Sequence, residues 1–145
     1  LHPLIPSSGG MALGQDVYFL GYPYGLSTDV GPELNADFPL PLVKKAIVSS
    51  VVFRDNRLEY LLLDGHNNPG FSGGPVYYTP PGKPQEHRVA GVISGYRYEW
   101  EPVYLKQKES SLTYKYNTGI IIAVGIRIVL DIIDTNPTGY ELKGE

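Results

Sequence analysis

The stretch DGHNNPGFSGGPV, from Asp64 to Val76, decides the fold that we expect for this chain. An apolar run at Leu58–Leu63 precedes it and a Val-Tyr-Tyr run leaves it, and both runs have the composition of β-strands. Glycine-rich segments between two such runs form turns. We therefore expect Ser72 to lie exposed on a turn that joins two strands.

The glycines on both sides of Ser72 determine which backbone conformations this turn can adopt. Gly70, Gly73 and Gly74 allow positive φ angles, and a backbone of that kind can direct neighbouring amides toward one point. If the amides of Gly70 and Ser72 converge, each would stabilise the charge on a carbonyl attacked by the Ser72 hydroxyl by roughly 3 kcal/mol. The alternative is a glycine-rich hairpin whose serine has no function. The full motif favours Ser72 as a nucleophile and Gly70 as an oxyanion-hole residue.

This motif resembles the nucleophile motif of the chymotrypsin/trypsin-like serine peptidases, Gly-x-Ser-Gly-Gly-Pro. Asp64 and the segment Asn68-Pro69-Gly70 are most similar to the HtrA-like bacterial branch of that family. The resemblance implies an all-β fold, namely a six-stranded antiparallel Greek-key barrel with a short C-terminal helix. It would be the second of two barrels. The catalytic histidine and aspartate are then expected in an N-terminal barrel that this chain lacks.

The resemblance also implies a substrate pocket. His66, six residues before Ser72, would form its floor, and a protonated His66 would favour acidic side chains, although pockets in this branch are usually apolar. Ser94 and Tyr96 would offer main-chain groups to an extended peptide. The turn at Gly21–Pro23 would shape the site without reacting. The pocket residues implied in this way are His66, Ile93, Ser94, Tyr96 and Gly119.

The rest of the chain is typical of short strands and turns. Residues 98–116 are polar and aromatic and indicate a surface loop or a strand pair, whose Tyr/Trp cluster is either a binding patch or a lid on a small core. The helix would begin at Gly125 or Ile126 and end at Ile133, with an Arg127–Asp131 pair on its exposed side. The expected strands are 14–25, 43–53, 58–63, 75–78, 88–96 and 117–124, and the polar segment 27–41 is expected to be a functional or mobile loop.

Length and composition limit the classes of function. A chain of 145 residues forms one domain, which we divide into a linker at 1–10, a barrel at 11–134 and a polar tail at 135–145. The net charge of -3 argues against nucleic acid as a partner, and no apolar run reaches the ~20 residues that cross a membrane. We expect a peptide or protein substrate and no cofactor. The chain contains no cysteine, which fits a cytoplasmic protein or an exported bacterial one.

Several alternatives remain. The chain begins at Leu1, which indicates a piece of a longer protein, and self-association through an uncovered face is then expected. His2 precedes Ser72 in the family's order, but its surroundings differ from the family's histidine turn. A non-catalytic peptide-binding module, or pseudoprotease, is the main alternative function. An α/β-hydrolase esterase is disfavoured because a β-rich run, rather than a helix, follows Ser72.

Overall fold

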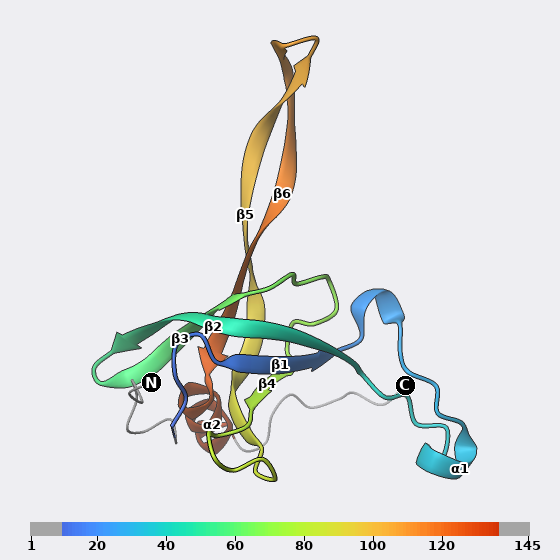
Figure 1. Ribbon diagram of the computed structural model, residues 1–145, viewed down its shortest axis with the longest axis vertical. Helices are drawn as coiled ribbons and strands as arrows, with labels where there is room; N and C mark the ends of the chain where they lie inside the picture. Colours follow the sequence, from blue (N-terminus) through green and yellow to red (C-terminus); the bar gives the residue numbers. More distant parts are fainter. Residues whose placement is uncertain (1–9, 137–145) are drawn as a thin grey trace.

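A computed structural model describes residues 10–136 and shows an all-β fold in which six antiparallel strands close into a barrel, followed by a helix (Figure 1). Most of the expected linker 1–10, including His2, and most of the expected tail 135–145 lie outside the described residues. The elements are β1 Asp16–Gly21, η2 Pro23–Gly25, α1 Pro32–Asn35, β2 Leu42–Arg54, β3 Arg57–Asp64, β4 Pro75–Tyr78, β5 Arg88–Leu105, β6 Lys108–Gly125 and α2 Ile126–Thr135.

The strands follow the order β1-β2-β3-β6-β5-β4 around the barrel, and β1 pairs with β4 to close it. β4, β5 and β6 are consecutive antiparallel neighbours, while β3 pairs with β6 rather than with β4. This arrangement is a Greek key. Because β3 and β4 are not neighbours, residues 65–74 have to cross between two separate parts of the barrel, and this crossing segment carries Ser72.

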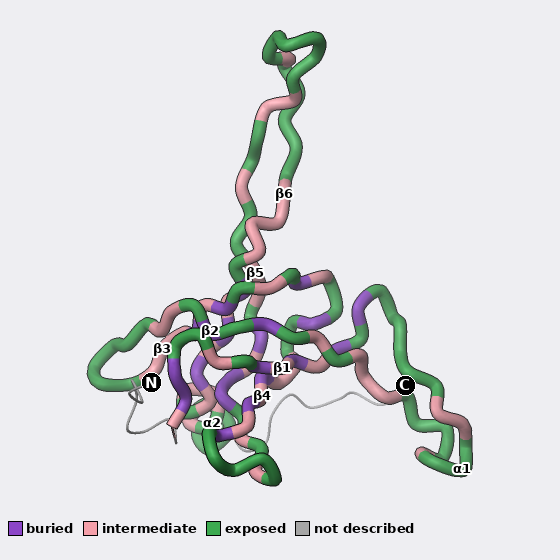
Figure 2. Tube along the Cα trace, viewed as in Figure 1, coloured by how far each residue is buried: buried purple, intermediate pink, exposed green. Residues whose placement is uncertain are grey.

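The barrel interior is filled by alternate residues of the strands, as the period of two along a strand requires. Val17 and Phe19 of β1, for example, are fully buried, whereas their neighbours are not. Figure 2 shows the buried positions gathered in the barrel. The core consists of Met11, Val17, Phe19, Ala46, Val48, Leu61, Leu63, Phe71, Val76, Tyr78, Ala90, Ile93, Ile121 and Ala123.

The helix α2 lies against β3, β5 and β6. Its predicted Arg127–Asp131 pair is replaced by an ion pair across elements, in which Arg57 Nη1 lies 2.8 Å from Asp131 Oδ2. Arg57 follows the two-residue turn between β2 and β3, where Asp55 and Asn56 have positive φ angles. That turn brings Arg57 to the helix. Ile133, the residue at which the helix was expected to end, is exposed.

β5 and β6 are much longer than the strands that the sequence predicted. Beyond the barrel they continue as a two-stranded arm, which rises away from the other strands (Figure 1). The arm comprises residues 97–118, and its tip is a turn at Lys106 and Gln107, both with positive φ. None of its residues belongs to the core, and the aromatic cluster is therefore no lid (Figure 2).

Candidate functional site at the Ser72 loop

Phe71 fixes the loop that carries Ser72. Its ring is fully buried and meets the ring of Phe19 edge to face, with 4.9 Å between the centroids. Ser72, the next residue, is exposed. Gly73 N–H donates to the carbonyl of Ile93 at 2.8 Å, and Ile93 N–H donates to the carbonyl of Gly74 at 2.9 Å. The serine is thus presented at the surface by a loop that is held by the core on one side and by β5 on the other.

Among the amides of residues 70–74, two have no acceptor in the described part of the chain. The N–H groups of Phe71, Gly73 and Gly74 donate to the carbonyls of Asn68, Ile93 and Phe71, respectively. Those of Gly70 and Ser72 have no acceptor in the described part of the chain. Unpaired backbone amides are strong donors that require a partner. They are available to an anionic or carbonyl oxygen, and Gly70 reaches this geometry with a φ of 102°.

The turn after β1 is hydrogen-bonded to the loop that carries Ser72. Tyr22 N–H donates to the carbonyl of Gly70 at 3.0 Å, and Tyr24 N–H donates to that of Pro69 at 3.3 Å. A Cβ atom at Gly21 would lie 2.6 Å from the ring of Phe71, so only glycine fits there. The Gly21–Pro23 turn therefore packs directly on the Ser72 loop, as expected.

Residues 66–68, which contain the predicted pocket floor His66, accept hydrogen bonds from side chains on two different strands. Lys44 Nζ donates to the carbonyl of His66 and to Asn68 Oδ1, the latter at 2.9 Å. Asn117 Nδ2 donates to the carbonyl of Asn67 at 2.7 Å. Lys44 and Asn117 are not among the site residues expected from the sequence, because only the pairing of distant strands brings them to this segment. Partial burial lowers the pKa of Lys44.

Asn67 is the buried polar residue of this segment, with only 2 % of its surface exposed. Its Oδ1 has no hydrogen-bond partner among the described residues.

The structure brings some of the predicted pocket residues together. Gly119, with a φ of 80°, accepts at its carbonyl from Gly65 N–H at 2.9 Å and therefore lies beside the segment that begins with His66. The His66 side chain is exposed, Ser94 is exposed and Tyr96 is half-buried on β5. Ile93 differs from the prediction. It is 1 % exposed and faces the barrel core, so its backbone rather than its side chain meets the loop.

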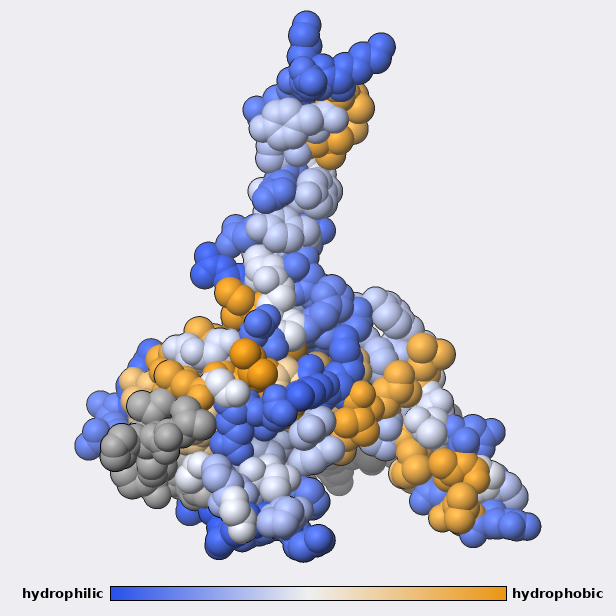
Figure 3. Space-filling model, in the orientation of Figure 1, coloured by the Kyte–Doolittle hydropathy of each residue, from blue (hydrophilic) through white to orange (hydrophobic). Residues whose placement is uncertain are grey.

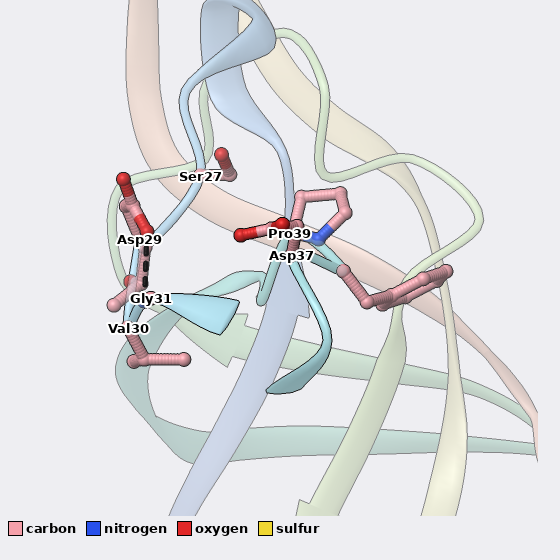
Figure 4. A pocket seen from close by; sticks show the side chains of 8 residues that line it. Ser27, Asp29, Val30, Gly31, Asp37 and Pro39 are labelled. Atoms are coloured by element: carbon pink, nitrogen blue, oxygen red, sulfur yellow. Dashed lines mark hydrogen bonds between the residues drawn. The ribbon is translucent and has the colours of Figure 1, made fainter. Parts of the chain in front are cut away.

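A cavity of about 320 Å³ lies elsewhere, within the long segment between β1 and β2 (Figure 4). Asp29, Asp37 and Phe38 are among its lining residues, and Asp29 Oδ1 accepts from Gly31 N–H at 2.9 Å. None of the predicted pocket residues lines it. Within residues 10–136 no group of three or more histidine, aspartate or glutamate side chains could hold a metal ion.

No protein-family model matches this chain, and no curated protein matches it either. In the described residues, no helix has both the length and the apolar character that crossing a bilayer requires.

Proposed function

We propose that this chain is the nucleophile-bearing barrel of a trypsin-like serine endopeptidase. The observation that carries the proposal is the exposed Ser72 next to two N–H groups, of Gly70 and Ser72 itself, that have no acceptor among the described residues. The loop is also anchored by Phe71 and by β5, so the donors are preorganised. Preorganised donors are the main source of catalysis at such sites.

In this mechanism Ser72 Oγ attacks the carbonyl carbon of the scissile peptide bond, while an imidazole removes the hydroxyl proton. The carbonyl oxygen becomes an oxyanion and accepts from the N–H groups of Gly70 and Ser72. The imidazolium then gives its proton to the departing amine, which leaves an acyl group on Ser72. Water hydrolyses this ester and restores the serine. The imidazole and the carboxylate that orients it would come from the N-terminal barrel that the family resemblance implies.

The same proposal places the substrate along β5. The main chain of the peptide would pair with Ser94 and Tyr96, whose strand is hydrogen-bonded to the Ser72 loop through Ile93. The side chain before the scissile bond would enter between the His66 segment and Gly119. Lys44 and Asn117 hold that segment in place.

Labelling with a fluorophosphonate tests the proposal. Attack by Ser72 Oγ on phosphorus expels fluoride and leaves a stable adduct, which mass spectrometry of the digested protein locates. We expect Ser72 to be labelled in the full-length protein and only slowly in this chain alone, because the base is missing. Ser72→Ala should abolish labelling and proteolysis, whereas Ser49→Ala, at an exposed site on β2, should preserve both. Wild-type proteolysis by Ser72→Ala would refute the proposal.

A second candidate is a non-catalytic peptide-binding module. The long arm favours it, because exposed strands can bind an extended peptide without a catalytic triad. The sequence upstream of Leu1 discriminates the two functions. A Thr-Ala-His-like turn followed some tens of residues later by an aspartate in a strand would support the peptidase. Absence of both would support the binding module.

A further inference from the structure

Among the described residues, one edge of the β5 strand has no partner for most of its length. β4 and the Ser72 loop cover this edge only as far as Ile93. From Ser94 to Leu105, the only strand that pairs with β5 in the described structure is β6, on the opposite edge. Pro102 has no N–H and interrupts the row of donors, so the continuous edge runs from Ser94 to Glu101, roughly 26 Å at about 3.3 Å per residue. Within it, the carbonyl of Arg97 already accepts from the Thr118 hydroxyl at 2.8 Å. An edge of this length is a template for an added strand.

The side chains along this edge alternate in chemistry. The register places Tyr98 opposite Asn117 and Trp100 opposite Lys115, so these two aromatic residues share one face of the arm. Glu99 and Glu101 lie on the other face, opposite Tyr116 and Tyr114. Trp100 is 60 % exposed. The edge therefore offers an aromatic row on one face and an acidic row on the other.

Neither carboxylate is fully used within the arm. Glu99 pairs with Arg97 on its own strand, at 2.8 Å between Nη2 and Oε1, and Glu101 accepts from the Tyr114 hydroxyl at 3.1 Å. Each carboxylate has about four acceptor positions, so both can receive further donors. On the aromatic face, Lys115 Nζ lies 3.6 Å from the centroid of the Tyr98 ring, so this cation already has an aromatic partner.

We propose that the free edge of β5 on the arm binds an extended polypeptide as an added strand, and that it selects a segment in which apolar and basic side chains alternate. The apolar side chains of the ligand would lie beside Tyr98 and Trp100. Its lysine or arginine side chains would lie beside Glu99 and Glu101, since cross-strand pairs of opposite charge stabilise a sheet. Glu99 and Glu101 thus favour basic over acidic side chains at these two positions, although residues 97–118 as a whole carry four basic and three acidic side chains.

The position of the edge suggests which polypeptide this is. A strand added to the arm runs toward Ile93, which is hydrogen-bonded to Gly73 and Gly74 of the Ser72 loop. If the proposed peptidase function holds, the bound segment is the part of the substrate that lies several residues from the scissile bond. This identification depends on the proposed function, whereas the binding depends only on the arm.

Fluorescence anisotropy of the Ser72→Ala chain with a fluorescein-labelled decapeptide of alternating leucine and lysine tests the binding without proteolysis. We expect saturable binding, and a blue shift of the emission of Trp100, the only tryptophan in the chain. A decapeptide of alternating leucine and glutamate should bind at least tenfold more weakly. Methylation of every backbone amide of the lysine peptide should also cost tenfold or more, because such a peptide cannot pair with a strand edge.

Charge reversal on the arm gives the decisive comparison. In Glu99→Lys/Glu101→Lys we expect the lysine peptide to lose about tenfold in affinity and the glutamate peptide to gain. Glu33→Lys/Asp134→Lys makes the same change in net charge at exposed positions on α1 and α2 and should leave both affinities unchanged. Equal effects of the two variants, or binding that tolerates methylation, would overturn the inference.

Light scattering and labelling separate the remaining outcomes. If the arm edge instead pairs with a second copy of this chain, the chain will be a dimer that does not bind the peptide, and the inference is wrong. If the peptide binds as expected while fluorophosphonate fails to label Ser72 in the full-length protein, the arm inference stands and the peptidase proposal fails.

Discussion

Gly70 lies where the Ser72 loop passes over the turn after β1. Its φ is 102°, and a Cβ atom there would lie 2.4 Å from the carbonyl oxygen of Tyr22. We expect Gly70→Ala to lower the free energy of unfolding, measured in urea, by about 2–4 kcal/mol, because strain and collision add. Gly73→Ala is the matched control, since its φ is 85° but its Cβ would meet no atom within 4 Å. It should cost only about 1–2 kcal/mol, and equal losses would contradict this account.

Lys44 predicts a dependence of stability on pH. Burial lowers its pKa below 10.5, so the unfolded chain binds more protons at this residue between the folded pKa and 10.5. Unfolding free energy therefore rises with pH across that interval. We expect the difference in urea stability between the wild-type chain and Lys44→Met to increase as pH rises toward 10.5. Tyrosine titrations cancel in this difference, and a difference that stays constant from pH 8 upward would refute the prediction.

At single positions, the sequence was informative where local backbone chemistry decided the structure. The exposure of Ser72 and the positive φ of Gly70 follow from the glycines on both sides of Ser72. Lys44 could not be found in this way, because its partners are 22 and 24 residues away and β2 must first be placed in the barrel. Ile93 was assigned to the pocket, but strand alternation directs its side chain to the core.

At the level of elements, the arm should be separable from the barrel. Tyr98 and Asn117 lie directly opposite each other, so an Asn-Gly turn can replace residues 99–116 between them. No core residue is removed. We expect the melting temperature to change by only a few degrees, because the lost contacts are exposed.

Loss of the arm should abolish binding of the leucine–lysine peptide. Fluorophosphonate labelling of Ser72 in the full-length protein should persist. A shortened chain that fails to fold would show that the arm contributes to the barrel, contrary to the burial pattern.

The full lengths of β5 and β6 were not predicted, although a strand pair was one of the two possibilities expected for residues 98–116. Burial alternates along β1 and along the barrel part of β6, where residues 120–124 are all apolar. The arm alternates aromatic and charged residues from Tyr98 to Glu101, but none of its residues enters the core, so this pattern did not mark it as a continuation of the barrel strands. The helix was recognised from its spacing, but the Arg57–Asp131 pair joins residues that are 74 positions apart.

On the scale of the whole molecule, the all-β class followed from composition and turn signals, and the barrel with its terminal helix followed from the family resemblance. What the sequence did not supply is how the ring closes. Tyr18 pairs with Tyr77 and Phe19 pairs with Val76. These pairs join β1 to β4, and β2 and β3 lie between these two strands in the sequence. A register between strands so distant in the chain depends on all the intervening pairings.

The segment between β1 and β2 carries a group of exposed hydrophobic side chains. Hydrophobic side chains gather over it, around α1, in Figure 3. Tyr24, Leu26, Leu34 and Phe38 are all exposed there. Exposed apolar patches of this kind usually meet a partner. The upstream barrel of the proposed peptidase is one candidate, and in its absence a second copy of the chain can cover the same patch.

We therefore expect this chain to self-associate. Its mean molar mass, measured by size-exclusion chromatography with light scattering, should rise with concentration. Leu34→Ser/Phe38→Ser should shift the chain to the monomer, because it removes apolar area from the patch. Leu105→Ser/Leu112→Ser removes exposed leucines from the arm instead and should leave the association unchanged. A wild-type chain that stays monomeric at high concentration would show that the patch needs no cover. Association lost only in the arm variant would move the interface to the arm and overturn the added-strand inference as well.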